Sequence, residues 1–330
     1  MNRKSISMKM LPRVALASCL CVAPGTALSA SAQTFPTKPI RFVVPFAPGG
    51  GSDILARAIA LKIGDSMGQP VIIDNRPGAN AVIAEDIVSK ATPDGHTLLL
   101  DTTAFVLNPQ FRRDLPFDPD RDFAPVIQPA SVWHVLAAHP SVAAQTVPEL
   151  IAAMKAAPGK FTYGSFGTGS TAHLAGELFN TMAGVASTHV PYKGGGPAIT
   201  DLIGGQITLI YGTVPLTLPH IKSGKVKAIA VTSPKRIAEL PQVQTVAEVL
   251  PGYEVSLWWA FLVPAGTPPA VIARLNGEIA QSLKLQDVRD RLAPQGFEFV
   301  GGSPQQLGRF MKAESAKWAK VIKASKIQME

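Results

Sequence analysis

Short apolar runs alternate with segments of helical periodicity in the first part of the chain. Residues 40–44, 71–74 and 97–101 are mostly apolar, which is typical of buried strands. Residues 52–66 and 81–91, which lie between them, repeat apolar positions every three or four residues and are predicted to be helices. Strands that alternate with helices predict βαβ units and a parallel sheet.

The pattern restarts near the middle of the chain and ends in a mostly helical tail. A second block is predicted from strands at 132–138, 161–165, 207–211 and 227–231 and from helices at 148–157, 171–183 and 197–203. The tail holds a strand at 257–263 and helices at 268–283 and 304–324. We therefore predict an α/β fold of two blocks, with the tail completing the first. Two such blocks commonly hold a ligand between them.

The N-terminus has the order of segments found in secretory signal peptides. Basic residues come first, an apolar stretch over residues 14–28 follows, and small residues close it at Ala30-Ser31-Ala32. The stretch is interrupted by Pro24-Gly25 and falls short of the roughly 20 apolar residues that a membrane anchor needs. We predict that residues 1–32 are a signal peptide, that cleavage after Ala32 leaves 298 residues, and that the protein is exported.

A lipoprotein signal is the alternative interpretation of the same segment. Leu16-Ala17-Ser18-Cys19 resembles a lipobox, which would leave a lipid on Cys19, but only five residues separate Arg13 from Cys19. That is short for the apolar core of a signal peptide. Both cysteines, Cys19 and Cys21, leave with the signal peptide, so the mature chain is predicted to have no disulfide, thiol nucleophile or cysteine-based metal site.

Charge excludes one class of partner. Removal of the signal lowers Lys+Arg from 31 to 27 and leaves Asp+Glu at 23, so the net charge falls from +8 to +4. The remaining basic residues form no stripe, which argues against a nucleic-acid-binding protein. A weak positive balance is compatible with a small anionic ligand.

A first glycine loop joins a predicted strand directly to a predicted helix. Its glycines let the backbone turn sharply and approach a ligand, and the free N–H groups at the start of the helix favour an anion. A plain tight turn with Ser52 as the helix N-cap is the alternative. The candidate ligand-binding residues are Phe46, Ala47, Pro48, Gly49, Gly50, Gly51, Ser52 and Asp53.

A second glycine loop repeats this arrangement in the second block. Its Gly167-x-Gly169-x-x-Ala172 matches a loose dinucleotide fingerprint, but the acidic residue expected about 20 positions later is missing. We predict an anion seat and not a cofactor site. The side chain of His173 either points at the ligand or only stabilises its helix. The candidates here are Ser165, Gly167, Thr168, Gly169, Ser170 and His173.

A third glycine loop contributes Tyr192 and Lys193 as candidate ligand-binding residues, ahead of a helix that Pro197 could begin.

Sequence motifs typical of enzymes are missing from the chain. The chain has no G-x-S-x-G and no G-x-x-x-x-G-K-[ST], which argues against a hydrolase or nucleotidase. Its histidines form no H-x-x-x-H pair, and the acids at 118, 120 and 122 lack the later residues of a calcium loop. We predict neither enzyme, cofactor nor metal.

Together these loops resemble the Bug family, the substrate receptors of tripartite tricarboxylate transporters. Further motifs carry the resemblance in order along the mature chain: Asp74-Asn75-Arg76-Pro77-Gly78-Ala79, Pro93-Asp94-Gly95-His96-Thr97, Leu174-Ala175-Gly176-Glu177-Leu178, Asp201-Leu202-Ile203-Gly204-Gly205-Gln206 and Pro219-His220-Ile221-Lys222-Ser223-Gly224. The resemblance implies a two-lobed type II periplasmic binding protein fold that closes around a small carboxylate, with residues 33–136 plus 255–330 as one domain and 137–254 as the other. It implies a monomer in the periplasm that serves membrane transporter subunits.

Two other functions are weighed against this one. A signalling receptor of the same fold would pass the ligand-bound state to a sensor, and the sequence does not separate it from a transport receptor. A hydrolase or oxidoreductase would need an activated nucleophile or a cofactor seat, and neither is visible.

The chain departs from the family pattern at two places. It reads Asn80-Ala81-Val82-Ile83-Ala84 where the family usually has Gly-Gly-Asn-Ile-Gly, and Gly212 stands where an Asp is often found. The missing Asp argues against an amino-acid ligand. Val82 and Tyr211 are expected to make the pocket more apolar, so the predicted ligand is a dicarboxylate or an aromatic or otherwise apolar carboxylate. One of the adjacent Trp258 and Trp259 is expected in the core and the other near the ligand.

Overall fold

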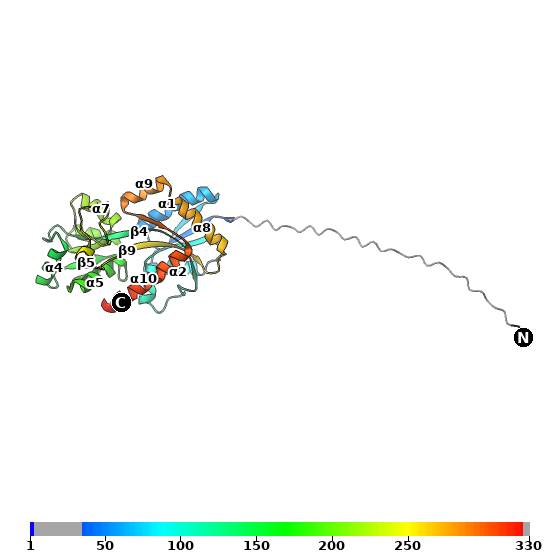
Figure 1. Cartoon of the computed structure of the whole chain (residues 1–330), viewed down its shortest axis with the longest axis horizontal. Coiled ribbons are helices and arrows are strands. Elements are labelled where there is room, and N and C mark those ends of the chain that lie inside the picture. The colour runs from blue at the N-terminus through cyan, green and yellow to red at the C-terminus, as the bar shows by residue number, and fades with distance from the viewer. Residues whose placement is uncertain (3–34, 326–330) are drawn as a thin grey trace. The chain divides into compact units, whose positions relative to one another are not determined.

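A computed structural model describes residues 1–2 and 35–325 of the chain (Figure 1). Residues 3–32 of the predicted signal peptide, together with its cleavage site, the lipobox and both cysteines, lie outside the described residues. Residues 35–325 belong to one compact unit, which contains every described helix and strand. None of these helices is long and apolar enough to span a membrane.

Three parallel strands form the first group in the sheet. β1 (Ile40–Val44) pairs with β2 (Val71–Asn75) on one side and with β3 (Thr97–Thr102) on the other. The connecting helices are α1 (Gly51–Met67) and α2 (Val82–Ser89), with the 3₁₀ turn η1 (Ala79–Ala81) before α2; α3 (Ala104–Phe111) follows β3. The predicted βαβ units are thus confirmed.

A second parallel group is formed by β5 (Thr162–Ser165), β6 (Thr188–Pro191) and β7 (Leu209–Thr213). Its helices are α4 (Val147–Ala156), α5 (Thr171–Ala183), α6 (Gly195–Ile203) and α7 (Val214–Lys222), and β8 (Lys227–Val231) follows. The tail contributes β9 (Ser256–Pro264), α8 (Pro269–Ser282), α9 (Gln286–Leu292), β10 (Glu298–Gly301) and α10 (Pro304–Ser325), with short 3₁₀ turns η2 (Val246–Glu248) and η3 (Ala293–Gln295).

One long strand, β4 (Phe123–Ala138), connects the two groups together with β9 (Figure 1). The strands follow the order β2-β1-β3-β9-β4-β7-β5-β6, and β8 and β10 pair with β4. The sequence predicted only residues 132–138 of β4, because Pro125 and Pro129 argue against a strand. The ladder with β9 instead accommodates them with register shifts between Pro125 and Ser131.

Strand directions make the two parallel groups face each other. β3 and β4 are both antiparallel to β9 and therefore run the same way, whereas β7 is antiparallel to β4. β3 ends at Thr102 opposite Trp259, and the neighbouring Trp258 pairs with Ser131 of β4. β7 ends at Thr213 opposite His134, which is three positions further along β4. The carboxyl edges of the two groups, from which all three glycine loops leave, thus point toward each other across β4.

Candidate functional site

The first glycine loop, residues 46–53, leaves the carboxyl edge of β1 and begins α1. Gly50 is the N-cap of α1, but no side chain caps this helix, in contrast to α4 and α5. The N–H groups of Gly50, Gly51 and Ser52 have no acceptor among the residues that the structure describes. They form the anion-binding arrangement that the sequence predicted for this loop.

Asp53 stabilises this loop from inside. Its Oδ2 accepts hydrogen bonds from Gly49 N at 3.0 Å and from Arg57 Nε at 2.9 Å. Burial acts to raise the pKa of Asp53, but the hydrogen bonds from Arg57, Gly49 and Asn75 outweigh burial and lower it. Asp53 is therefore an ionised structural group that holds Gly49 in its left-handed conformation (φ 84°).

The side chains of the two adjacent tryptophans point to opposite faces of the sheet, because side chains alternate along a strand. Both are buried, but Trp259 lies under the first glycine loop, where its Nε1 donates to Ser52 Oγ at 2.8 Å. Trp258 points to the other face, and its Nε1 donates to Glu314 at 3.1 Å. Trp259 is thus the one nearer the candidate site, and it supports the loop from below.

A strained turn follows β2 at the same edge. Ala79, Asn80 and Ala81 all have positive φ, at 48°, 52° and 81°, a conformation that non-glycine residues rarely adopt. Asn108 fixes this turn, because its Nδ2 donates to the Asn80 carbonyl at 2.8 Å and its Oδ1 accepts from Asn80 Nδ2 at 3.0 Å. Glycines in the family pattern at this place would lower the strain that the alanine and asparagine carry here.

Several backbone N–H groups of the second glycine loop, residues 165–173, donate to acceptors within the same loop. The N–H of Gly167 donates to Ser165 Oγ and that of Ser170 to the Gly167 carbonyl, both at 3.1 Å. The N–H of Gly169 donates to His173 Nδ1 at 3.1 Å. Ser170 caps α5 by accepting from His173 N. The N–H and hydroxyl of Thr168 have no partner in the described part of the chain and stay open to a ligand.

Beneath this loop lies a pair of neutral histidines. His173 and His189 stack with ring centroids 3.8 Å apart, and His189 Nε2 lies 2.6 Å from Ser165 Oγ. Burial and the neighbouring His189 lower the pKa of His173 to about 3, and burial lowers the pKa of His189 to about 4. Because Nδ1 of His173 accepts from Gly169, its proton sits on Nε2. His189 is a residue that sequence reasoning missed, since its only signal was its place next to the third glycine loop.

The third glycine loop leaves β6 beside the second. Tyr192 is half-buried, and its hydroxyl donates to Asp201 Oδ2 at 2.7 Å, so this group is already occupied. Lys193 is exposed and has no ion pair among the residues at 35–325 that the structure describes. Of the two candidates, Lys193 is the one that can offer its charge to a ligand.

One expected pocket residue is placed elsewhere. Tyr211 is 2% exposed and packs edge-to-face on Tyr163 at 5.8 Å. The expectation that Tyr211 makes the pocket more apolar is therefore wrong, because the alternation of β7 turns its side chain into the core. Val82 is half-buried and also packs against that core.

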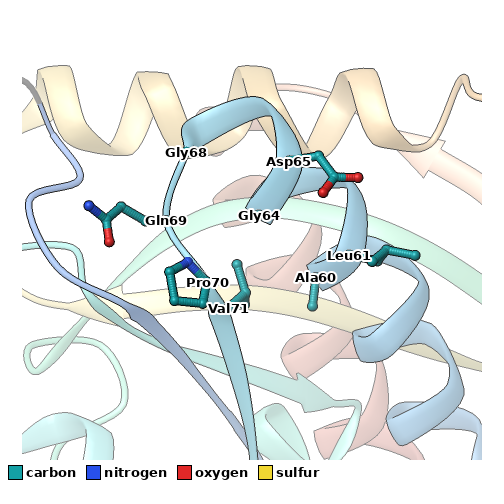
Figure 2. A pocket seen from close by; sticks show the side chains of 8 residues that line it. All are labelled: Ala60, Leu61, Gly64, Asp65, Gly68, Gln69, Pro70 and Val71. Atoms are coloured by element: carbon teal, nitrogen blue, oxygen red, sulfur yellow. The ribbon is translucent and has the colours of Figure 1, made fainter.

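A surface hollow of about 360 Å³ lies at the far end of α1, away from the glycine loops (Figure 2). Its lining includes Leu61, Asp65, Gln69 and Val71. The hollow lies at the C-terminal end of α1, where the helix dipole disfavours an anion, and the N–H of Gly68 here already donates to the Gly64 carbonyl. The glycine loops remain the better candidate site. No group of three or more His, Cys, Asp or Glu side chains within the described residues could hold a metal ion.

Comparison with known proteins defines the class. Residues 55–327 match the model of the tripartite tricarboxylate transporter family receptor, and the chain belongs to this family. Its members are binding receptors and not enzymes, as the sequence predicted. Protein BugT of Bordetella pertussis is 37% identical over 319 residues, which cover 96% of this chain and 98% of BugT.

Solved structures agree with the fold. The chain resembles Rpa4515 of R. palustris with adipate at a TM-score of 0.84 and 38% identity, over 89% of this chain and 99% of that one. It resembles the periplasmic binding protein BugD at a TM-score of 0.81 and 31% identity, over 90% of this chain and 100% of that one. It resembles MatC of Rhodopseudomonas palustris with bound malate at a TM-score of 0.79 and 31% identity, over 87% of this chain and 100% of that one. The predicted α/β periplasmic binding protein fold is confirmed.

Proposed function

We propose that this protein is an extracytoplasmic receptor that captures a small carboxylate and delivers it to the membrane subunits of a tripartite tricarboxylate transporter. The carboxylate lies between the two facing carboxyl edges. The observation that carries this proposal is the uncapped start of α1, where three backbone N–H groups lack an acceptor at that edge. Adipate and malate in the two structural neighbours support a carboxylate as the ligand.

Binding closes two lobes around the ligand in this proposal. Residues 33–136 plus 255–330 form one lobe and residues 137–254 the other, and β4 and β9 cross between them. A ligand that contacts both carboxyl edges binds the closed state more tightly than the open state and so shifts the population toward closure. The signal-peptide pattern of residues 1–32 supports export to the periplasm, and in this proposal the exported receptor acts as a monomer.

A signalling receptor is the second candidate function, because it would use the same closure. The two differ in the protein that recognises the closed form. Capture of membrane transporter subunits by the ligand-saturated receptor supports transport, and capture of a sensor kinase or its periplasmic domain supports signalling.

We expect Gly51→Pro to bind the carboxylate about 10- to 100-fold more weakly than Gly51→Ala, because the proline removes one hydrogen bond to a charged group. The alanine keeps the N–H and adds the same Cβ, which would lie 3.2 Å from Trp259 Cζ2, so the comparison separates the lost N–H from this close contact. Proline is tolerated at the first position of a helix, and the preceding Gly50 has the extended conformation (φ −80°, ψ 171°) that proline requires of its neighbour. The measurement is isothermal titration calorimetry of the mature protein with adipate and malate, after a thermal melt shows that the variant folds.

Gln286→Pro is the matched control. It removes the same N–H from the first position of α9, after an extended Leu285, on an exposed residue away from the glycine loops. Its carboxylate affinity should equal that of the unmodified protein. Equal affinity of both variants would contradict the placement of the carboxylate at α1.

A further inference from the structure

The carboxyl edge of β5, β6 and β7 carries an apolar wall made by Phe166 and Leu216. Both side chains are half-buried and pack against the same hydrophobic cluster. A methyl group on Gly195 would lie 2.7 Å from Leu216 Cδ2 and 3.1 Å from Phe166 Cε1. Both side chains therefore lie against Gly195 at the third glycine loop.

Gly212, on β7, lies beside this wall. A methyl group there would lie 2.4 Å from Thr217 Cγ2 and 3.6 Å from Leu216 Cδ2. A larger residue at this place would displace Leu216 or Thr217, and a charged one would enter an apolar surface. Neither Phe166 nor Leu216 was a candidate in the sequence, since a lone Phe or Leu belongs to no motif.

The acids of the two facing edges cannot serve a cationic group of a ligand. Asp53 is paired with Arg57, and its second oxygen is buried. Asp101, at the end of β3, is fully buried. Asp74, near the end of β2, is paired with Arg41 and Arg76. Asp201 lies two turns into α6 and not at its start, and it accepts the hydroxyl of Tyr192 at 2.7 Å. An ammonium group bound between the edges would thus lose its hydration without gaining a carboxylate partner, which is unfavourable.

The groups that remain open are suited to oxygen anions. Beside the free N–H groups of α1, the hydroxyl of Thr168, the ammonium of Lys193 and the protonated Nε2 of His173 have no partner within the described residues. Each of them can donate a hydrogen bond to a carboxylate.

We infer that the receptor selects carboxylates with a plain hydrocarbon body and rejects their 2-amino counterparts, with the wall of Phe166 and Leu216 receiving the hydrocarbon. This inference rests on the proposed function and specifies its ligand class. The pair that tests it is adipate and 2-aminoadipate, which share chain length and both carboxylates and differ in one ammonium group. Calorimetry with the mature protein is expected to give adipate at least about tenfold tighter binding.

One variant is expected to weaken the preference for adipate. Leu216 lies in the first turn of α7, where an acidic residue is compatible with the helix dipole. We expect Leu216→Asp to shift the ratio of the two affinities toward 2-aminoadipate by at least about tenfold, because it supplies the missing carboxylate. Leu61→Asp is the matched control, since Leu61 is 60% exposed on α1, and it should leave the ratio unchanged.

The outcomes separate the two proposals. Equal affinity for adipate and 2-aminoadipate, or a ratio unaffected by Leu216→Asp in a folded variant, overturns the inference and leaves the carboxylate receptor in place. Failure of adipate, malate, succinate and benzoate alike to bind the mature protein overturns the proposed function, and the inference falls with it.

Discussion

Glu314→Ala is expected to lower the free energy of unfolding by about 3–5 kcal/mol. Oε2 of Glu314 accepts hydrogen bonds from Trp258 Nε1 at 3.1 Å and Trp318 Nε1 at 3.0 Å. Both indoles are fully buried, and the carboxylate is 8% exposed. The alanine leaves two buried N–H groups without an acceptor and opens a cavity between α10 and β9. Thermal unfolding of the ligand-free mature protein should show a Tm lower by roughly 6–12 °C.

Two further variants test whether the lost hydrogen bonds to the indoles cause this loss of stability. Glu314→Gln keeps an oxygen that can accept from the indoles, and we expect it to lose less than half as much stability. Glu254→Ala makes the same truncation at an exposed residue that forms no hydrogen bond or ion pair in the described part of the chain, and it should change stability by no more than about 0.5 kcal/mol. A Tm of Glu314→Ala that equals that of Glu254→Ala would show that the indoles do not depend on this carboxylate.

Glu85→Gln is expected to remove a steep loss of stability at alkaline pH. Glu85 is fully buried beside Asp101, and Asn108 Nδ2 donates to its two oxygens at 3.0 and 3.2 Å. Burial and the charge of Asp101 raise the pKa of Glu85 to about 10, and burial raises that of Asp101 to about 6. Oδ2 of Asp101 is buried with no other hydrogen-bond partner, so the proton that Glu85 retains is what joins the two carboxyl groups.

The sign of the pH dependence follows from that proton. A glutamic acid in the unfolded chain loses its proton above about pH 4.5, whereas folded Glu85 keeps it up to about pH 10. The folded state therefore binds more protons across this window, and its free energy of unfolding falls as the pH rises. One such proton changes the stability by about 1.4 kcal/mol per pH unit. Glutamine mimics the protonated acid without titrating, so the difference between the two proteins should grow by up to about 4 kcal/mol from pH 6 to pH 9.

Urea unfolding at pH 6 and pH 9 measures this difference. Glu254→Gln removes an exposed carboxyl group and serves as the control, with an unchanged pH dependence. Parallel curves for Glu85→Gln and the unmodified protein would mean that Glu85 is ionised in the folded state. The pair also concerns the site, because Asn108 connects Glu85 to the strained turn at Asn80.

Much of the architecture was predictable because it depends on local patterns. Strands 40–44 and 227–231 and helix 171–183 were predicted with the observed bounds, since their apolar periodicity and flanking glycines or caps agree. The sequence analysis did not predict α3, β6, α9 or β10. α3 contains Pro109, which argues against a helix, and β6 is short and only partly buried. Both are fixed by neighbours that are distant in sequence.

The site could be predicted as three loops but not as a set of functioning groups. Gly-rich turns between a strand and a helix identified the loops at 46–53, 165–173 and 190–198. Which donors are free depended on side-chain partners. The Gly169 amide is occupied by His173, and Tyr192 is occupied by Asp201. These contacts are set by rotamers and by packing between elements, which spacing along the chain does not encode.

The sequence by itself determined the class of fold, the three loops that can bind an anion and the family, because these follow from periodicity, glycine placement and long motifs in order. Only the tertiary structure decided that the two carboxyl edges face each other across β4, that Trp259 supports the first loop while Trp258 binds Glu314, and that Glu85 shares a proton with Asp101. The physical reason is that these properties arise from strand direction, register and burial, which bring together groups far apart in the chain and remove them from water.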